Sequence, residues 1–218
     1  MRIPPGRAGR LWLLRRLDVA RRGADVLDQK RQTLLREQGR LAEHFSAATA
    51  EWERQAAAAA EWNERALTIA GPRRLLVSAL HRRGRVEVSV EWRNMLGVVV
   101  PASASVQIGS SPDFVALGGG ASVALAAQAH ERALVAAAAH ASARMAHEAI
   151  TAELTRTTRR LRAIERRWIP EHQAELARLE LRLEELELED VTRARWAQER
   201  QLGETAGRGG ASDRRPRL

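Results

Sequence analysis

The 218-residue chain contains no cysteine and no tyrosine, and aromatic residues make up only 4% of it. The absence of cysteine excludes both a disulfide framework and a thiolate metal site. A compact globular domain of this length would normally be richer in aromatic residues. Alanine, arginine, leucine and glutamate dominate instead, which is a mixture typical of long coiled-coil helices.

Lysine is nearly absent as well, since Lys30 is the only lysine among 36 basic residues. The phosphate-binding loop ends in glycine, lysine and serine or threonine, and the residues around Lys30 do not have this order. The glycines at 118–120 lack the spacing of a dinucleotide-binding motif and are interpreted as a linker. Neither kind of nucleotide site is therefore expected.

Histidine offers no arrangement typical of catalysis or metal binding. His140 and His147 share one face of a predicted helix, but two full helical turns separate them, which is too far for one metal ion. None of the six histidines has a serine nucleophile in a recognisable setting. We interpret His140 and His147 as polar residues of a helix seam, and we expect a non-catalytic protein without cofactor or metal.

Long hydrophobic runs are missing too. The segment 11–14 is too short for the apolar core of a signal peptide. The most apolar stretch, 121–139, carries Gln128, His130, Glu131 and Arg132, so it is not a membrane-spanning helix. These features predict a cytoplasmic protein with no direct membrane insertion.

The formal net charge of the chain is +9. A basic balance is compatible with nucleic acid, an anionic membrane surface or an acidic protein partner. However, the basic residues are spread along the predicted helices and are interleaved with 27 acidic residues. This pattern favours a solvated helix surface over a nucleic-acid-binding one.

A heptad pattern of apolar or small residues runs from Leu13 to Ile69. Positions at alternating steps of four and three are polar only at Arg31, Gln38 and Gln55. A period of 3.5 residues predicts a left-handed supercoil, and polar residues within its seam commonly fix the register. Gly71-Pro72 then predicts the end of this first helix.

The next region changes its periodicity from helical to alternating. Valine alternates with polar residues from Val86 onward, and a turn near Gly97 precedes a second β-branched run. Pro101 indicates an edge position or the end of this second strand. We predict a β-hairpin that includes Val86, Val88, Val90, Gly97, Val98 and Val100.

A second long heptad pattern occupies residues 121–202. Its phase slips by one position near Pro170, where the missing N–H also predicts a helix kink. The remaining residues, 203–218, are small, polar and basic, and we expect them to be disordered. The predicted organisation is therefore helix 1–70, hairpin and connector 71–120, helix 121–202 and tail 203–218.

The two long helices are predicted to pair antiparallel within one chain. Alanine is concentrated at 56–60 and 133–141, whereas leucine is concentrated at 11–17 and 176–188. Antiparallel pairing brings thin segments together at one end and leucine-rich segments together at the other. The predicted fold class is mainly α, a long antiparallel two-helix coiled coil with a short β-hairpin at the turning end.

Three segments carry a resemblance to a known family. The first is Pro5-Gly6-Arg7 followed by Leu14-Arg15-Arg16-Leu17, the second is VEVSVEWRNMLGVVVP at 86–101, and the third is TRRLRAIERRWIP at 158–170. In this order, and with the helix–hairpin–helix plan, they resemble the D subunit of the V/A-type ATPases, the central rotor shaft of a rotary ion pump. The resemblance covers nearly the whole chain, from Pro5 to about Arg200.

This resemblance implies a non-catalytic shaft that transmits torque and lies at the cytoplasmic side of the membrane. It implies that the terminal segments stand inside a catalytic hexamer of A and B subunits. The middle region would lie near the F subunit of the central stalk and the C/d subunit that links to the membrane ring. The basic residues regarded as candidate partner contacts are Arg7, Arg10, Arg15, Arg16, Lys30, Arg31, Arg159, Arg160, Arg193 and Arg195.

Two other hypotheses remain open at this point. A basic coiled-coil protein that bridges nucleic-acid duplexes would bind DNA with an affinity that falls steeply with salt. A homodimeric scaffold would pair its helices between chains, so its mass in solution would depend on concentration.

Overall fold

The structure of the chain is a computed structural model that describes residues 3–81, 85–109 and 120–209. The chain divides into two compact units. The first unit combines Met1–Val26 with Leu161–Leu218, and the second consists of Leu27–Arg160. Helix α1, Gly6–Ala70, contributes its beginning to the first unit and the remainder to the second.

Helix α1 is 65 residues long and contains no proline. It ends at Gly71, whose φ of +78° lies in the left-handed region that glycine adopts readily. The Gly71 N–H donates to the carbonyl of Leu67 at 3.0 Å, which satisfies one of the free carbonyls of the last turn. The predicted end of the first helix at Gly71 is confirmed.

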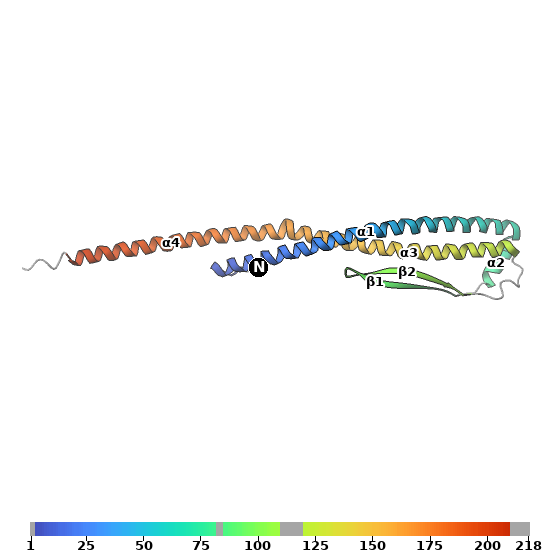
Figure 1. Cartoon of the computed structure of the whole chain (residues 1–218), viewed down its shortest axis with the longest axis horizontal. Helices are drawn as coiled ribbons and strands as arrows, with labels where there is room; N and C mark the ends of the chain where they lie inside the picture. Colours follow the sequence, from blue (N-terminus) through green and yellow to red (C-terminus); the bar gives the residue numbers. More distant parts are fainter. Residues whose placement is uncertain (1–2, 82–84, 110–119, 210–218) are drawn as a thin grey trace, which may run out of the picture. The chain divides into compact units, whose positions relative to one another are not determined.

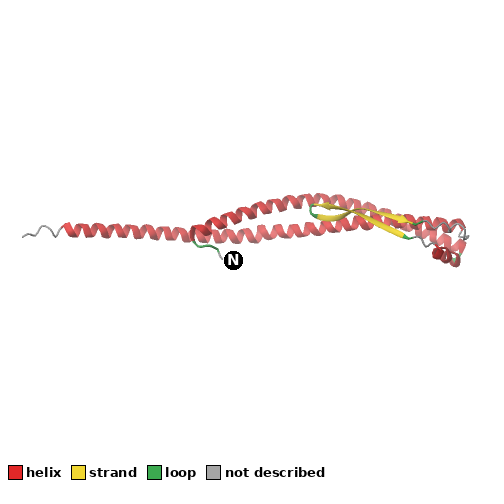
Figure 2. Ribbon diagram, turned by 90° about the horizontal axis from the view of Figure 1, so that it is seen from below, coloured by secondary structure: helices red, strands yellow, loops and turns green. Residues whose placement is uncertain are grey.

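In the second unit, α1 lies antiparallel to α3, Gly120–Ala163 (Figures 1 and 2). As residue numbers rise along α1, the numbers of their partners on α3 fall, which is the pattern expected for antiparallel pairing within one chain. The contacts that define this order are Lys30 with Glu153, Gln38 with Thr151, Phe45 with His147 and His140, Trp52 with His140, and Ala66 with Val123. The predicted fold class is confirmed.

The main core cluster of the second unit joins three elements. Leu34 and Leu41 of α1 pack with Ala146 and Ile150 of α3 and with Val100 of the hairpin. Leu34, Ile150 and Val100 have no exposed surface. A smaller cluster of Ala66, Val123 and Ala126 lies near the end of α1, where small side chains allow close approach of the helices.

The hairpin consists of β1, Val86–Met95, and β2, Val98–Ile108, paired antiparallel. Leu96 and Gly97 form its two-residue turn with φ values of +56° and +85°, as in the turns that match the twist of a hairpin. The Gly97 N–H donates to Asn94 Oδ1 at 3.0 Å. The predicted hairpin residues all lie on these strands and this turn.

The second strand does not end at Pro101, which was one of the two predicted alternatives. Pro101 pairs with Trp92 where the register shifts between Glu91 and Trp92, so the proline occupies an irregularity of the ladder. The strand then continues to Ile108. Because Pro101 has no N–H, a bulge is a position where it removes no regular ladder bond.

A short helix, α2, Pro72–His81, was not predicted. The segment 71–120 was interpreted only as hairpin and connector. Pro72 is the first residue of α2, where a missing N–H and a fixed φ are favourable. Leu75 of α2 packs against the smaller core cluster. The glycines at 118 and 119, interpreted as part of a linker, lie outside the described residues.

In the first unit, the beginning of α1 packs against the last helical segments. A π-helix, η2, Ile164–Trp168, separates α3 from α4, Ile169–Gly209. Leu13 and Leu17 of α1 and Leu161 are buried here. Helix α4 extends to Gly209, beyond the expected boundary at residue 202, whereas 210–218 lie outside the described residues. No helix in the described ranges is long and apolar enough to cross a membrane.

Candidate functional site

The end of α4 is the clearest candidate for a partner-binding surface. Arg7 Nη2 of α1 contacts Glu187 Oε1 at 2.8 Å, and α4 then runs on alone past the start of α1 (Figure 1). Every side chain from Glu184 to Arg200, which we call the terminal segment of α4, is exposed. Leu188 and Trp196 are 69% and 67% exposed.

Two exposed apolar residues of the terminal segment, Leu188 and Trp196, lie on one helical stripe, whereas the exposed Leu186 lies on another face. Leu188, Thr192 and Trp196 are spaced by four residues, so their side chains lie on one face. They line a shallow surface cavity of about 530 Å³ together with Glu185, Glu189 and Arg193. An apolar stripe edged by charged residues is the surface that an amphipathic helix buries against a partner.

Some of the predicted contact residues already pair with acidic side chains of the same chain. Arg7 and Arg10 bridge to Glu187 and Glu180 of α4. Arg193 pairs with Glu189 and Asp190 of its own helix. Exposed ion pairs of this kind contribute little to stability. These arginines can therefore leave their ion pairs and contact a partner with only a small loss of free energy.

Other predicted contact residues are exposed and make no ion pair within the described part of the chain. They are Arg15, Arg159, Arg160 and Arg195. Arg160 nevertheless acts electrostatically on Glu153, whose pKa it helps to lower. Arg15 and Arg195 belong to the first unit, and Arg159 and Arg160 to the second.

Arg16 is engaged inside the first unit. Its guanidinium carbon lies 4.8 Å from the ring centroid of Trp12 and 5.5 Å from that of Trp168. Trp168 in turn stacks on His172 with their ring centroids 3.7 Å apart. The planar guanidinium therefore joins α1 to η2 through aromatic faces, which a lysine side chain does much less well.

Lys30 forms a half-buried bridge between α1 and α3. Its Nζ donates to Glu153 Oε1 at 2.7 Å, and the two side chains are 32% and 17% exposed. The hydrogen bond from Lys30 holds the pKa of Glu153 below its usual value, although partial burial opposes this shift. The pair ties the two helices together in a defined register.

The polar residues of the α1 seam are only partly exposed, and they bond in different directions. Gln38 reaches across to Thr151 Oγ1 at 3.3 Å, whereas Gln55 donates to Glu51 of its own helix. Arg31 donates twice to Asp28 Oδ1, and this bond lowers the pKa of Asp28. Gln38 is therefore the seam residue whose hydrogen bond links α1 to α3.

His140 and His147 lie in the seam and stack on aromatic rings of α1. Phe45 lies between them, with ring centroids at 5.4 and 5.8 Å, and Trp52 stacks on His140 at 5.0 Å. The seven-residue spacing of His140 and His147 matches that of Phe45 and Trp52, a signal that could have predicted the stack. In the described ranges, no group of three or more potential metal ligands comes together.

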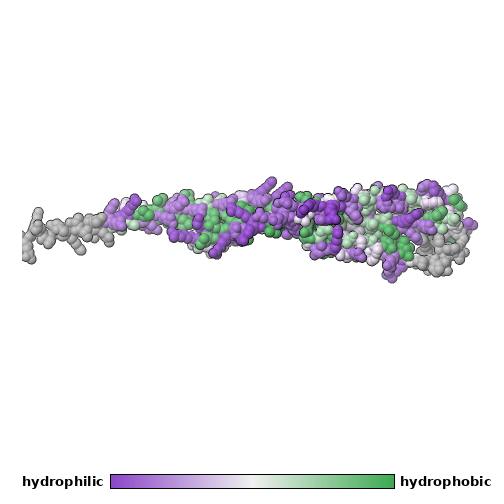
Figure 3. All heavy atoms as spheres, in the orientation of Figure 1, coloured by the Kyte–Doolittle hydropathy of each residue, from purple (hydrophilic) through white to green (hydrophobic). Residues whose placement is uncertain are grey.

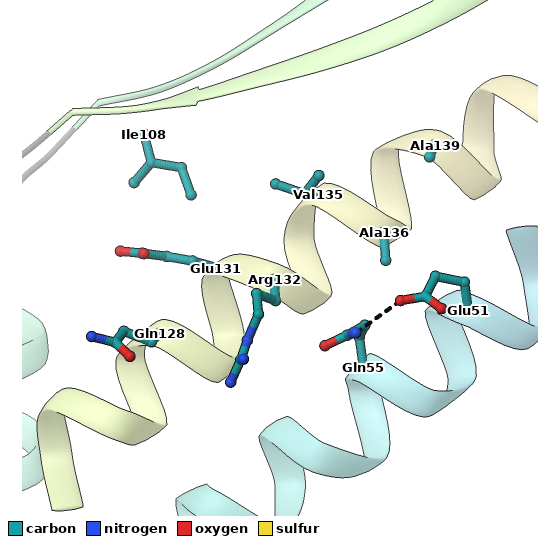
Figure 4. A pocket seen from close by; sticks show the side chains of 9 residues that line it. All are labelled: Glu51, Gln55, Ile108, Gln128, Glu131, Arg132, Val135, Ala136 and Ala139. Atoms are coloured by element: carbon teal, nitrogen blue, oxygen red, sulfur yellow. Dashed lines mark hydrogen bonds between the residues drawn. The ribbon is translucent and has the colours of Figure 1, made fainter.

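A cavity of about 690 Å³ lies between α1, α3 and the end of β2 (Figure 4). Ile108 lies opposite Val135, and Ala136 and Ala139 lie along the neighbouring turns of α3. Glu51, the acid on the α1 side, is occupied by its bond to Gln55. Glu131 and Arg132 of α3 also line this cavity.

A second cavity, about 470 Å³, lies between the end of α1, α2 and α3 and is lined mainly by apolar residues. Figure 3 shows hydrophobic residues in small patches among hydrophilic ones on the visible face. Leu67, Leu76 and Leu80 are exposed near the turn between α1 and α2 and on α2 itself. The second unit therefore has an apolar surface that its described residues do not cover.

Comparison with known proteins decides the family. The profile of the family described as the D subunit of ATP synthase matches residues 11–199, which is most of the chain. The chain belongs to the ATP synthase D-subunit family. The resemblance seen in the three sequence segments is thereby confirmed, and the chain is a D subunit of the V/A-type ATP synthases.

Individual relatives of this family cover nearly the full length of the chain. The V-type ATP synthase D subunit of Anaeromyxobacter sp. strain Fw109-5 is 32% identical over 199 residues, covering 88% of this chain and 91% of the relative. The A-type ATP synthase D subunit of Halobacterium salinarum is 28% identical over 194 residues, covering 88% and 87%. As a member of the D-subunit family, the chain has other subunits of the complex as partners.

Proposed function

We propose that the chain is the central rotor shaft of a V/A-type rotary ATPase. It transmits torque between ion translocation in the membrane and ATP synthesis or hydrolysis in the catalytic head. It carries out no chemistry itself and binds no cofactor. Its place is at the cytoplasmic side of the membrane, as a peripheral part of the complex.

The observation that carries this proposal is the terminal segment of α4, residues 184–200. Its side chains are all exposed although Leu188 and Trp196 form an apolar stripe on one face. Such a helix is stabilised when another protein surrounds or covers it. We infer that the catalytic hexamer of A and B subunits is that protein, because the chain belongs to the D-subunit family.

The charged residues fit the same role. Arg7, Arg10 and Arg193 are exposed partners in weak ion pairs, and Arg15 and Arg195 are exposed as well. Charges on an exposed rim steer association and fix the orientation of a partner more than they add affinity. In this proposal they contact the inner wall of the hexamer. Arg159, Arg160, Lys30 and Arg31 belong to the second unit and contact the other subunits of the central stalk.

The remaining partners are assigned to the second unit. The apolar surface around α2 and the end of α1 takes the C/d subunit that links to the membrane ring. The paired part of α1 and α3 takes the F subunit of the central stalk. The first assignment rests on the exposed apolar residues Leu76 and Leu80 of α2 and on membership of the family, and the second rests on membership of the family alone.

The test is co-expression of the full chain with the A and B subunits, followed by mass measurement of the purified complex. We expect one copy of the chain in each hexamer. The double change Leu188→Ala and Trp196→Ala should weaken this binding by roughly 30-fold, because buried tryptophan contacts carry about 2 kcal/mol at interfaces. Ile69→Ala is the matched control, since Ile69 is also highly exposed but lies at the other end of α1.

Two results would contradict the proposal. One is a hexamer that purifies without the chain although both are soluble and folded. The other is a double variant that binds as tightly as the unchanged chain. ATP hydrolysis by the isolated chain would contradict the assignment of a non-catalytic role.

A further inference from the structure

The second long heptad pattern has two parts, and one residue more than a continuous heptad repeat allows lies between them. Up to the last residue of the π-helix η2, the seam includes Leu161, Ile164 and Trp168. After it, Leu176, Leu179 and Leu183 follow one position later than that phase requires. A π-turn contains one residue more than an α-turn, so η2 absorbs the extra residue locally.

The hydrogen bonds and the packing agree with this explanation. The Ile169 N–H donates to the carbonyl of Ile164, five residues earlier, as in a π-turn. Leu161 is buried before the turn, and Leu176, Leu179 and Leu183 are each partly buried after it. The apolar face therefore returns to α1 on the far side of η2, and the phase slip does not turn it away.

The π-turn also accommodates Pro170, the predicted site of a kink. In a regular α-helix the proline ring would meet the carbonyl of Arg166, four residues earlier, and would leave that carbonyl without a donor. Arg166 lies within the π-turn. The extra residue and the proline thus occur together at one irregularity of the helix.

The π-turn places Trp168 where α1 can hold it. Arg16 lies against the ring faces of both Trp12 and Trp168, and His172 stacks on Trp168 with a 19° angle between the ring planes. The His172 Nδ1 is 2.9 Å from the Trp168 carbonyl oxygen. Four side chains from α1, η2 and α4 therefore form one layered contact, which we call the Arg16 stack.

A sequence shorter by one residue could form a regular α-helix here, with no π-turn. Without the extra residue, Ile169 would occupy the seam position of Trp168, and an uninterrupted heptad pattern would continue to Leu183. An aliphatic residue suited to the seam is therefore already present next to Trp168. Because π-turns occur frequently at functional sites, the presence of this one points to a role for the position of Trp168.

We propose that Arg16 and Trp168 are positioning residues that fix the rotation of α1 and α4 about each other. This inference rests on the proposed shaft function. Aliphatic seam contacts have no preferred direction, and the exposed pairs of Arg7 and Arg10 are weak and flexible. A guanidinium that lies over one ring on each helix resists rotation, because turning either helix breaks one of the two contacts. The Arg16 stack thereby passes torque from one helix of the terminal pair to the other.

The test uses the complete ion-translocating complex, reconstituted in vesicles with variants of this chain. Arg16→Lys keeps the positive charge but loses the planar stack, and Trp168→Leu keeps an apolar seam residue. For both we expect ions transported per ATP hydrolysed to fall roughly two- to fivefold, the range expected for the loss of one such contact. Trp168→Phe keeps an aromatic face and should restore most of the coupling.

A deletion separates the role of the π-turn from simple packing. Removing Arg166 and changing Pro170→Ala gives a continuous heptad pattern with Ile169 in the seam. This variant should keep its Tm within about 2 °C of the unchanged chain, yet couple as poorly as Trp168→Leu. Removal of the exposed Ala152 is the matched control, because it shifts the seam inside a regular part of α3 and should lower the Tm strongly.

The outcomes distinguish this inference from the proposed function. If the unchanged chain restores no ion-coupled ATP turnover, the shaft function itself fails. If the unchanged chain restores it and Arg16→Lys or the Arg166 deletion couples equally well, the positioning role is overturned. A loss of coupling that only follows a lower Tm, or an Arg166 deletion as unstable as the Ala152 deletion, also overturns it, because the stack would then serve packing alone.

Discussion

Two helical parts of the molecule each have apolar residues on one face, but this face is buried in one part and exposed in the other. In the main core cluster, Leu34, Leu41 and Ile150 are buried between α1, α3 and the hairpin. In the terminal segment of α4, Leu188 and Trp196 also share one face of a helix but are largely exposed. The first part is completed by the chain itself, and the second is not covered by any described residue.

The difference shows what an apolar stripe on a helix does and does not determine. The stripe provides a face that gains free energy on burial, at about 25 cal/mol for each Å² of apolar surface removed from water. It does not determine which surface covers it. Where the chain supplies the cover, the stripe stabilises the fold. Where it does not, the same stripe is available for assembly with another subunit.

The strongest way to test this contrast is to remove a buried side chain from the core cluster. Ile150→Ala leaves a cavity among Leu34, Leu41 and Val100, and it should lower the free energy of unfolding by about 3 kcal/mol. For a chain of this size, that corresponds to a Tm lower by about 10 °C. Thermal unfolding followed by circular dichroism measures the change.

The conservative variant Ile150→Val is the control for this experiment. It removes one methylene group and should cost about 1 kcal/mol. Equal and small effects of both substitutions would mean that the core cluster does not hold α1, α3 and the hairpin together.

The second prediction concerns the half-buried bridge between α1 and α3. The pKa of Glu153 is lowered chiefly by its hydrogen bond from Lys30. The bridge therefore stabilises the fold fully above the ordinary glutamate pKa of about 4.3, and this contribution disappears as the pH falls through the lower pKa of the folded state. Lys30→Met should cost about 1 kcal/mol near pH 7, and this cost should shrink as the pH falls below the ordinary glutamate pKa.

Urea unfolding of the unchanged chain and of Lys30→Met at a series of pH values measures this difference. The exposed pair of Arg144 and Glu148 on α3 provides the comparison, because Arg144→Met removes an ion pair whose side chains are 60% and 59% exposed. We expect that variant to change stability by less than about 0.5 kcal/mol at any pH. The difference in free energy of unfolding between Lys30→Met and the unchanged chain should become smaller at low pH. If it stays the same, the bridge to Glu153 is not its cause.

Much of the fold could be predicted because heptad spacing and alternation are local properties. Leu13, Leu17, Leu34 and Leu41 were placed in the seam by spacing alone, and all four are buried. Ile69 fits the same spacing but is largely exposed, since α1 ends one residue later. Spacing identifies the face of a helix, whereas burial also requires a partner of sufficient length.

The features that were missed depend on contacts between distant residues. Helix α2 is only ten residues long, and its stability comes from packing on α3 and the end of α1, which spacing within 72–81 does not reveal. The phase slip near Pro170 was visible in the sequence, and the missing N–H of the proline predicted a kink there. The π-turn that absorbs the extra residue is identified only by the hydrogen bond from Ile169 to Ile164. The contacts of Arg10 with Glu180 and of Arg16 with Trp168 could not be predicted, because these partners lie more than 150 residues away in the sequence.

The third prediction compares two glycines of α1 in the first unit. A Cβ atom at Gly9 would clash with the Pro4 carbonyl oxygen and would lie 3.3 Å from Leu179 Cδ2, so Gly9→Ala must displace the start of the chain. It should lower stability by about 1 kcal/mol. Gly23→Ala has open space around the new Cβ and should raise stability by about 0.5–1 kcal/mol, because alanine favours a helix over glycine.

Thermal unfolding of the two variants side by side measures this difference, and opposite signs are expected. If Gly9→Ala were as stabilising as Gly23→Ala, the residues before α1 would not pack over Gly9. The comparison thus tests whether the residues before α1 pack against Gly9 or leave it exposed to solvent.

The smallest effect on stability is expected at the terminal segment of α4. Leu188→Ala and Trp196→Ala together should change the free energy of unfolding of the isolated chain by less than about 0.5 kcal/mol, because both side chains are largely exposed already. The same pair should be the one that weakens binding to the catalytic hexamer most. Unfolding measurements on the isolated chain, made beside Ile150→Ala, check the first statement. A loss of several kcal/mol would mean that the terminal segment is covered by another part of the same chain or by a second copy, and that its stripe is not reserved for a partner.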